Sequence, residues 1–168
     1  MLFSEFAQIN PKVDLKKGES YPFIEMVDLT PGQRYIFAIK EKMFKGGGSR
    51  FQTGDVIFAR ITPCLEHGKI AQIKGKDYEK YFGSTEFFVF RAKDGVSDEG
   101  FLFYLSYSDI LRKPAEKSMY GASGRQRADL SVVKSVEVPN NHLLIFNKIY
   151  VLLSAYDDLI ENNLRRIQ

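Results

Sequence analysis

The chain has 168 residues, 44% of them hydrophobic and 27% charged, and a formal net charge of +3 at pH 7. This size and composition predict one globular domain and exclude a disordered chain or two ordinary domains joined by a linker. No apolar run approaches the roughly 18 residues that a membrane-spanning helix needs, and the N-terminus lacks the order of a signal peptide, so we expect a cytoplasmic protein. The single cysteine, Cys64, and the two histidines, His67 and His142, form no cluster at zinc-ligand spacing, so we expect neither a metal nor another cofactor.

The first half of the chain has the pattern of strands and turns. Residues 21–27 form a short apolar stretch, and residues 29–32 contain a Pro-Gly turn signal. Residues 55–61 have the β-branched and aromatic bias of a buried strand, and residues 69–73 are its expected hairpin partner. Residues 86–91 are again strongly β-prone. We therefore expect a core of curved, twisted β-sheet.

The second half of the chain adds helices to this core. Ser97 and Asp98 supply helix-capping side chains, and the spacing of the apolar residues that follow predicts a helix over residues 101–111 that ends before Pro114. Residues 130–133 predict a short helix, and residues 135–139 predict a final edge strand. The body, residues 1–140, is thus expected to be an α+β domain.

From residue 142 onwards, apolar residues follow steps of three and four, as expected for an α-helix that packs along one face. A second apolar row makes the apolar surface wider than a single contact needs. Residues 141–168 therefore predict a long, coiled-coil-like spacer helix that contacts both the body and a partner. Asn163 in the first row either fixes the register of a helix pair or is simply exposed. The first row, predicted to mediate dimerisation, is Ile145, Ile149, Leu152, Tyr156, Leu159, Asn163 and Ile167, and the second is Phe146, Leu153, Ile160 and Leu164.

Two glycine-rich loops carry basic residues. Residues 44–50 contain three consecutive glycines, which lose much backbone entropy in any helix or strand, so we expect a loop there. Its bare backbone can bring N–H groups to phosphate oxygens, with charge from Lys45 and Arg50; the alternative is a flexible surface loop. Residues 120–127 end in Arg125-Gln126-Arg127, which combines two forked guanidinium groups with an amide able to address adenine; alternatively, the arginines are merely solvated.

Polar side chains also surround the end of the strand expected at residues 55–61. From such a rigid support Arg60 can read guanine, and Thr62 can meet a thymine methyl group. The alternative is that Arg60 forms a structural ion pair with Glu66 or Asp55. Ser84 and Thr85 are weaker candidates, because these residue types are typical of an ordinary turn. The complete set of residues predicted to contact duplex DNA is Lys45, Ser49, Arg50, Arg60, Thr62, Lys69, Ser84, Thr85, Ser123, Arg125, Gln126 and Arg127.

The motifs needed for catalysis on DNA are missing from the sequence. A DNA methyltransferase needs a glycine-rich cofactor loop and an Asp/Asn-Pro-Pro-aromatic motif, and the sequence has neither. A metal-dependent nuclease needs an acid-x-Lys strand with an upstream acidic partner, and the nearest fragment, residues 14–16, has no such support. Cys64 has only His67 as a candidate base in its motif, so packing accounts for it better than nucleophilic catalysis. We expect no intrinsic enzyme activity.

Several segments together resemble the specificity subunits of type I restriction-modification systems. They are residues 54–66 (GDVIFARITPCLE), 68–69 (GK), 83–87 (GSTEF), 124–127 (GRQR) and the closing helix around residues 153–163. Their order is that of one target-recognition domain followed by one spacer helix, a unit that normally occurs twice in each subunit of the family. The resemblance implies a non-catalytic subunit that reads half of a split target in double-stranded DNA and directs methyltransferase and restriction subunits to it.

The resemblance also implies that the partner subunits use S-adenosylmethionine, ATP and magnesium, for which this sequence has no binding motif. Because the sequence carries one copy of the repeat, we expect it to pair through the closing helix, as a two-fold homodimer or as a heterodimer with another half-subunit. A homodimer would read an interrupted palindrome. The alternative function is that of a solitary half-subunit, a structural or regulatory interaction protein without specific DNA readout.

Overall fold

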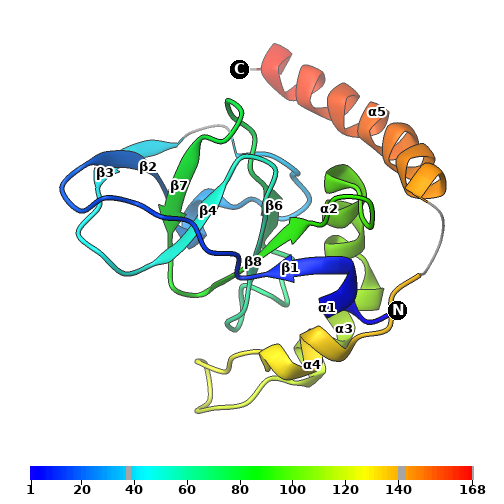
Figure 1. The fold of residues 1–168 in the computed structure, drawn as a ribbon, viewed down its shortest axis with the longest axis horizontal. Helices are drawn as coiled ribbons and strands as arrows, with labels where there is room; N and C mark the ends of the chain where they lie inside the picture. The colour runs from blue at the N-terminus through cyan, green and yellow to red at the C-terminus, as the bar shows by residue number, and fades with distance from the viewer. Residues whose placement is uncertain (37–38, 140–142, 168) are drawn as a thin grey trace.

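The computed structural model describes residues 1–36, 39–139 and 143–167. Two four-stranded sheets lie next to each other, short helices cover one of them, and a long helix runs along the outside (Figure 1). This arrangement confirms the predicted α+β class with a long C-terminal helix. Among the residues that the structure describes, no helix is both long enough and apolar enough to cross a membrane.

The central sheet is antiparallel throughout and is buried on both faces. Val56 and Phe58 pack into the core beneath the helices, whereas Ile57 between them packs towards the second sheet. Burial on both faces explains why β5 and the first four residues of β8 are uninterrupted apolar runs. The hairpin predicted between residues 55–61 and 69–73 is confirmed. The strand order is β1 (Ala7–Ile9), β8 (Phe87–Ala92), β5 (Val56–Ala59) and β6 (Ile70–Gln72).

The second sheet contains one parallel pair, β2 with β7, among antiparallel neighbours. The prediction that residues 44–50 form a loop is wrong for Ser49 and Arg50, which begin a strand paired with β7. A Cβ at Gly48 would lie 2.5 Å from the carbonyl oxygen of Gly83, so glycine permits the close backbone approach at which this strand begins. The strand order is β3 (Lys40–Met43), β2 (Ser20–Ile24), β7 (Lys80–Gly83) and β4 (Ser49–Gln52).

Short helical segments complete the body. The Asp98 carboxylate accepts a 2.8 Å hydrogen bond from the Phe101 N–H and caps α2, as predicted. The helix predicted at residues 130–133 is confirmed, whereas the strand predicted at residues 21–27 stops at Ile24 because a 3-10 turn follows it. The segments are α1 (Phe3–Phe6), η1 (Met26–Asp28), α2 (Glu99–Tyr107), α3 (Asp109–Lys117) and α4 (Leu130–Ser135).

The prediction that one helix ends before Pro114 is wrong. The break comes earlier, at Ser108, whose backbone is extended, and α3 then runs through the proline. Leu111 and Ala115, on either side of Pro114, are fully buried. The burial of these two side chains offsets the free-energy cost of the backbone hydrogen bond that proline cannot donate.

The edge strand predicted at residues 135–139 is also wrong. Ser135 belongs to α4, so too few residues remain for a strand. Residues 136–138 instead pair with the N-terminal segment through a single antiparallel bridge between Leu2 and Glu137. Two backbone hydrogen bonds flank this bridge: the Phe3 N–H donates to the Val136 carbonyl at 2.8 Å, and the Val138 N–H donates to the Met1 carbonyl at 2.9 Å. The first and last segments of the body therefore lie side by side.

The long helix, α5 (Leu143–Ile167), confirms the predicted C-terminal helix and packs on α2. Phe146 is 1% exposed and contacts the rings of Phe6 and Phe101, with centroid distances of 5.4 and 4.4 Å. A Cβ at Gly100 would lie 2.1 Å from the ring of Tyr150, so the helix can sit this close only because α2 carries a glycine there.

A buried arginine joins α5 to the central sheet and to α2. Arg34 is 5% exposed and donates through Nε to the Gln72 side-chain oxygen at 2.8 Å. Its Nη1 lies 3.9 Å from the carboxylate of Asp157 on α5, which also accepts a hydrogen bond from the hydroxyl of Tyr104. The ring of Tyr150 lies 5.0 Å from the guanidinium carbon. These contacts fix the angle between α5 and the body.

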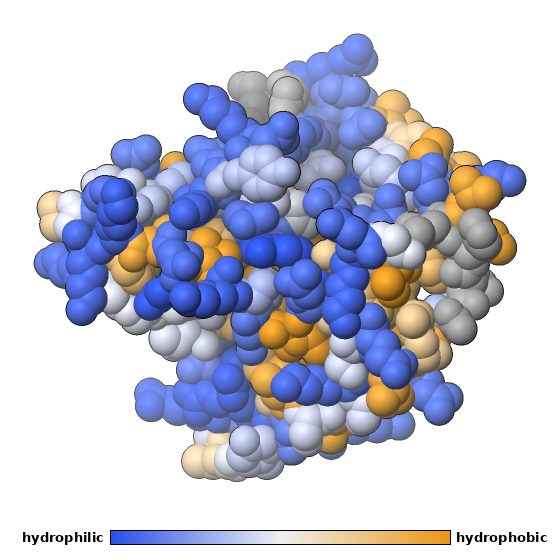
Figure 2. All heavy atoms as spheres, in the orientation of Figure 1, coloured by the Kyte–Doolittle hydropathy of each residue, from blue (hydrophilic) through white to orange (hydrophobic). Residues whose placement is uncertain are grey.

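The outer face of α5 is apolar and exposed. Leu152, Tyr156 and Leu159 are 63%, 61% and 58% exposed, and Figure 2 shows hydrophobic side chains along the edge where α5 lies in Figure 1. From the second row, Phe146 is buried in the body. The other predicted dimerisation residues Ile145, Ile149 and Asn163 are exposed as well, while the side chain of Ile167 lies outside the described structure.

Candidate nucleic-acid interface

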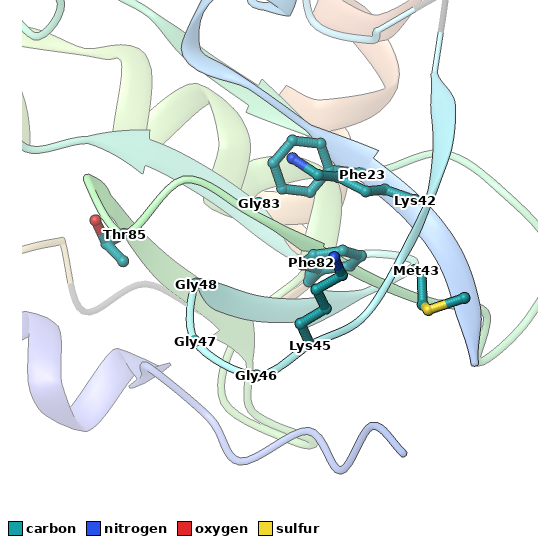
Figure 3. A pocket seen from close by; sticks show the side chains of 10 residues that line it. All are labelled: Phe23, Lys42, Met43, Lys45, Gly46, Gly47, Gly48, Phe82, Gly83 and Thr85. Carbon is teal, nitrogen blue, oxygen red and sulfur yellow. The ribbon is translucent and has the colours of Figure 1, made fainter. Parts of the chain in front are cut away.

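Two neighbouring clefts lie beside the start of β4 and the turn before β8. We name them the arginine cleft, with a volume of about 310 Å³, and the glycine cleft, with a volume of about 490 Å³ (Figure 3). Gly48 and Thr85 line both, so the two clefts adjoin. The arginine cleft is lined by Asn10, Pro11, Lys12, Val13, Gly48, Ser49, Arg50, Arg60, Thr85, Phe87, Phe88 and Val89; the glycine cleft is lined by Phe23, Lys42, Met43, Lys45, Gly46, Gly47, Gly48, Phe82, Gly83 and Thr85.

The arginine cleft brings together four residues that the sequence predicted to contact DNA: Ser49, Arg50, Arg60 and Thr85. They come from β4, from the residue after β5 and from the turn before β8. The Ser49 hydroxyl donates to a backbone carbonyl of β8 at 2.9 Å, which ties β4 to the central sheet. Among the described residues, Arg50 contacts the Phe44 ring at 5.1 Å but forms no ion pair, and the Thr85 hydroxyl forms no hydrogen bond.

Arg60 is held on an aromatic surface with part of its hydrogen-bonding capacity unused. Its guanidinium carbon lies 4.9 Å from the ring centroid of Phe88. Its Nε is buried, has no hydrogen-bond partner among the described residues and lies 4.0 Å from the Glu86 carboxylate. The alternative prediction, a structural ion pair of Arg60, names the wrong partners: the pair forms with Glu86 instead of Glu66 or Asp55, and Asp55 is bound to Arg91 at 2.7 Å.

Arg127 forms a two-pronged ion pair with Glu86. Its Nη2 donates to Oε1 at 2.6 Å and its Nε donates to Oε2 at 2.9 Å. The hydrogen bonds from Arg127 hold the pKa of Glu86 below its ordinary value, with a smaller contribution from the charge of Arg60. The backbone of Arg127 also forms β-bridges with Ile61 and Tyr120. The guanidinium therefore anchors the base of the loop at residues 121–126.

Thr62 and Gln126 tie the same loop to the end of β5. The Thr62 N–H donates to the Gln126 carbonyl at 3.0 Å, and the Gln126 N–H donates to the Thr62 hydroxyl at 3.2 Å. Beyond this tie, Ser123 and Arg125 are exposed. The loop thus presents Arg125 to solvent from a fixed base.

Two predicted contact residues have local partners instead. The Lys69 ammonium donates to the Met26 carbonyl at 2.7 Å, and Lys69 lines neither cleft within the described structure. The Ser84 hydroxyl accepts a hydrogen bond from the Glu86 N–H at 3.1 Å, the pattern of an ordinary turn. Lys45, by contrast, is exposed at the rim of the glycine cleft.

Two further lysines, which the sequence pattern did not single out, line the clefts: Lys12 the arginine cleft and Lys42 the glycine cleft. Lys12 reaches the cleft because the Asn10 side-chain oxygen accepts a 2.9 Å hydrogen bond from the Val89 N–H, a contact between residues far apart in the chain. Lys42 faces the ring of Phe23 across the β2–β3 pair. An alternating pattern in residues 40–43 was the one local signal for an exposed basic strand.

The structure adds no support to a catalytic centre. Cys64 is a half-buried free thiol, and the exposed Asp14 is paired with Lys12 at 3.4 Å. Within residues 1–36, 39–139 and 143–167, no group of three or more His, Cys, Asp or Glu side chains is placed to hold a metal ion.

Two curated relatives from Escherichia coli share this sequence pattern. The chain is 28% identical over 169 residues to the type I restriction enzyme EcoAI specificity subunit, covering 96% of this chain and 29% of that protein. It is 29% identical over 142 residues to the EcoEI specificity subunit, covering 81% of this chain and 24% of that one. The chain therefore spans less than a third of each relative.

The fold has a counterpart among solved structures. The HsdS subunit from Thermoanaerobacter tengcongensis superimposes with a TM-score of 0.69 and 22% identity, over 89% of this chain and 38% of that one. Residues 5–168 also match the family model described as the type I restriction modification DNA specificity domain. Since this match covers nearly the whole sequence, the chain belongs to the family of type I restriction-modification DNA specificity domains.

Proposed function

We propose that this chain binds double-stranded DNA at a specific sequence through the arginine cleft and the loop at residues 121–126. The observation that carries the proposal is the gathering of Lys12, Arg50 and Arg60 from three separate segments into one cleft. The Arg60 guanidinium lines this cleft against the Phe88 ring, and its N–H groups other than the buried Nε can donate to an acceptor on DNA. Membership of a DNA specificity family supports the same conclusion.

Phosphate and base contacts would fall to different residues. Lys12 and Lys45 are flexible point charges suited to phosphate oxygens, which position a protein on DNA without reading it. Arg50 and Arg125 carry planar guanidinium groups that can bind guanine through two hydrogen bonds, and the side chain of Gln126 can address adenine. Arg127 would act indirectly, by holding the loop that presents Arg125.

Partner subunits would supply the chemistry. The relatives are specificity subunits of type I restriction enzymes. We infer that this chain is likewise non-catalytic and directs methyltransferase and restriction subunits to the DNA target. The exposed apolar face of α5 supports pairing with a second copy or with another specificity domain. The alternative, a structural or regulatory interaction protein without DNA readout, rests on that apolar face alone.

Selection of bound sequences from random duplex DNA tests the proposal, with the chain alone and then with candidate methyltransferase subunits. We expect a consensus motif. Arg50→Ala and Arg125→Ala should each relax one position of the motif, whereas Lys12→Ala should weaken binding to all sequences equally and reduce its salt dependence. Lys76→Ala, at an exposed lysine outside both clefts, is the matched control. If no motif is recovered in either arm, the interaction-protein alternative is favoured.

A further inference from the structure

The glycine cleft has an aromatic floor. The rings of Phe23 and Phe82 are tilted at 52° with centroids 4.7 Å apart (Figure 3). Phe44, which is buried and does not line the cleft, packs its edge against Phe82 at a centroid distance of 5.2 Å. The ammonium of Lys42 lies 4.1 Å from the Phe23 centroid, over the ring. The floor is therefore apolar and aromatic, and it lies next to a positive charge.

The wall of this cleft is bare backbone. Gly46, Gly47 and Gly48 all have positive φ angles, of 103°, 80° and 73°. Side chains cannot fill the space here, because a Cβ at Gly48 would lie 2.5 Å from the Gly83 oxygen and one at Gly83 would lie 2.4 Å from the Ile24 oxygen. The N–H groups of Gly46 and Gly47 have no hydrogen-bond partner among the described residues. They leave unused donors at the mouth of an apolar cavity.

We propose that the glycine cleft binds one unpaired nucleobase of the DNA together with its phosphate. The aromatic floor matches the face of a base, and base stacking on such a ring is stronger than an exposed cation–π contact, so a base can displace the Lys42 ammonium from Phe23. The displaced ammonium, Lys45 and the free glycine N–H groups match a phosphate. The volume of about 490 Å³ leaves room for both.

The position of the cleft fits a nucleotide taken out of the duplex. It adjoins the arginine cleft through Gly48 and Thr85, so a strand held by the arginines passes its mouth. A base stacked in a duplex offers only its edge, and therefore its face can reach the Phe23 ring only after unstacking. This inference rests on the proposed function for the placement of the duplex. Binding of an unpaired base in the glycine cleft does not depend on that placement.

Three duplexes of one sequence test the inference: fully paired, with one extra thymidine bulged out, and with an abasic residue in place of that thymidine. We expect the wild type to bind the thymidine bulge about 5- to 150-fold more tightly than the abasic bulge, the range for stacking one base on an aromatic ring. Phe23→Leu keeps an apolar side chain but removes the ring, so the ratio should fall to near one. Phe23→Tyr keeps the ring and should keep the ratio.

Binding of the fully paired duplex separates the two proposals and reports the integrity of the fold. If the paired duplex binds but the thymidine gives no advantage, the inference is overturned and the proposed function stands. If only the bulged duplex binds, the inference stands and the proposed function is overturned. An advantage that survives Phe23→Leu would place the base elsewhere and overturn the inference. Should Phe23→Leu not fold, two other measurements replace it: binding by Lys42→Met, and the fluorescence of 2-aminopurine at the bulge. A 2-aminopurine fluorescence that does not change when the wild type binds refutes base binding in the glycine cleft.

Discussion

The carboxylate of Glu86 binds the guanidinium of Arg127 at 2.6 and 2.9 Å and lies 4.0 Å from the Nε of Arg60. One acidic residue therefore sits between two of the arginines in the candidate interface. Arg127 is occupied by this pair, whereas Arg125, two residues earlier, is exposed and forms no ion pair with the described residues. The two arginines of one short motif should consequently differ in what they do.

Arg125→Ala and Arg127→Ala separate loop structure from DNA contact. Arg125→Ala should leave thermal unfolding unchanged and weaken binding to the selected target by about 1 to 3 kcal/mol, as expected for an arginine that reads a base. Arg127→Ala should lower the melting temperature and increase proteolysis within residues 121–126, because the loop loses its anchor. Equal effects of both variants on stability would contradict the assignment of DNA contact to Arg125 and loop anchoring to Arg127.

The Glu86–Arg127 pair predicts a pH dependence of stability. Arg127 lowers the pKa of Glu86 in the folded state, so the carboxylate stabilises the fold above its unfolded pKa and loses that contribution as pH falls through the lower, folded pKa. Glu86→Gln should therefore be less stable than wild type at neutral pH, and the difference should shrink below about pH 4.5. Urea unfolding of both proteins across this range measures the effect. A difference that is constant with pH would rule out the carboxylate charge as its source.

Gly100→Ala tests the close contact between α2 and α5. Alanine favours a helix by about 0.5 to 1 kcal/mol over glycine, but its Cβ would lie 2.1 Å from the Tyr150 ring. Overpacking should dominate, with a net loss of about 1 to 3 kcal/mol in the free energy of unfolding. In a Tyr150→Leu background the same change should be neutral or stabilising. A double-mutant cycle by chemical denaturation measures this coupling, and purely additive changes would contradict it.

The apolar face of α5 predicts self-association. Leu152→Glu with Leu159→Glu introduces charge into the most exposed part of the face and should yield monomers, because burying unpaired carboxylates costs several kcal/mol. Sedimentation of wild type and variant at micromolar concentration measures the state, and a dyad pair predicts an interrupted palindrome in the selected DNA. A wild type that stays monomeric on DNA, or a motif without dyad symmetry, argues against a homodimer and for a different specificity domain as partner.

The chain alone should not turn over DNA. Purified protein with S-adenosylmethionine, or with magnesium and ATP, is expected neither to methylate nor to cut a duplex, because the sequence lacks the motifs for either reaction. Radiolabelled methyl transfer and gel analysis of supercoiled DNA are the measurements. Activity that co-purifies with the chain and disappears in Cys64→Ala or Asp14→Ala would show that the chain is an enzyme.

Patterns repeated over several residues could be predicted from the sequence. The β5–β6 hairpin has continuous apolar, β-branched runs, and α5 has apolar residues at steps of three and four, so the type of each element follows from its pattern of burial. The fate of Pro114 could not be predicted, because it depends on Leu111 and Ala115 meeting the core in three dimensions. The partner of Arg60 could not be predicted either, since Glu86 is brought beside it by strand pairing between β5 and β8.

The bridge between Leu2 and Glu137 bears on the order in which the protein folds. Phe3 and Phe6 pack on Phe90 and Phe101 and share one buried core with Val138 and Phe146, so this core is complete only when the end of the body is present. Contacts of such long sequence separation make folding slow, because the entropy of closing the loop is lost before the contacts form. During synthesis, we therefore expect the packing of the N-terminal segment to be completed only after residues beyond 146 emerge. Truncations that end before Phe146 should accumulate as chaperone-bound or aggregated chains.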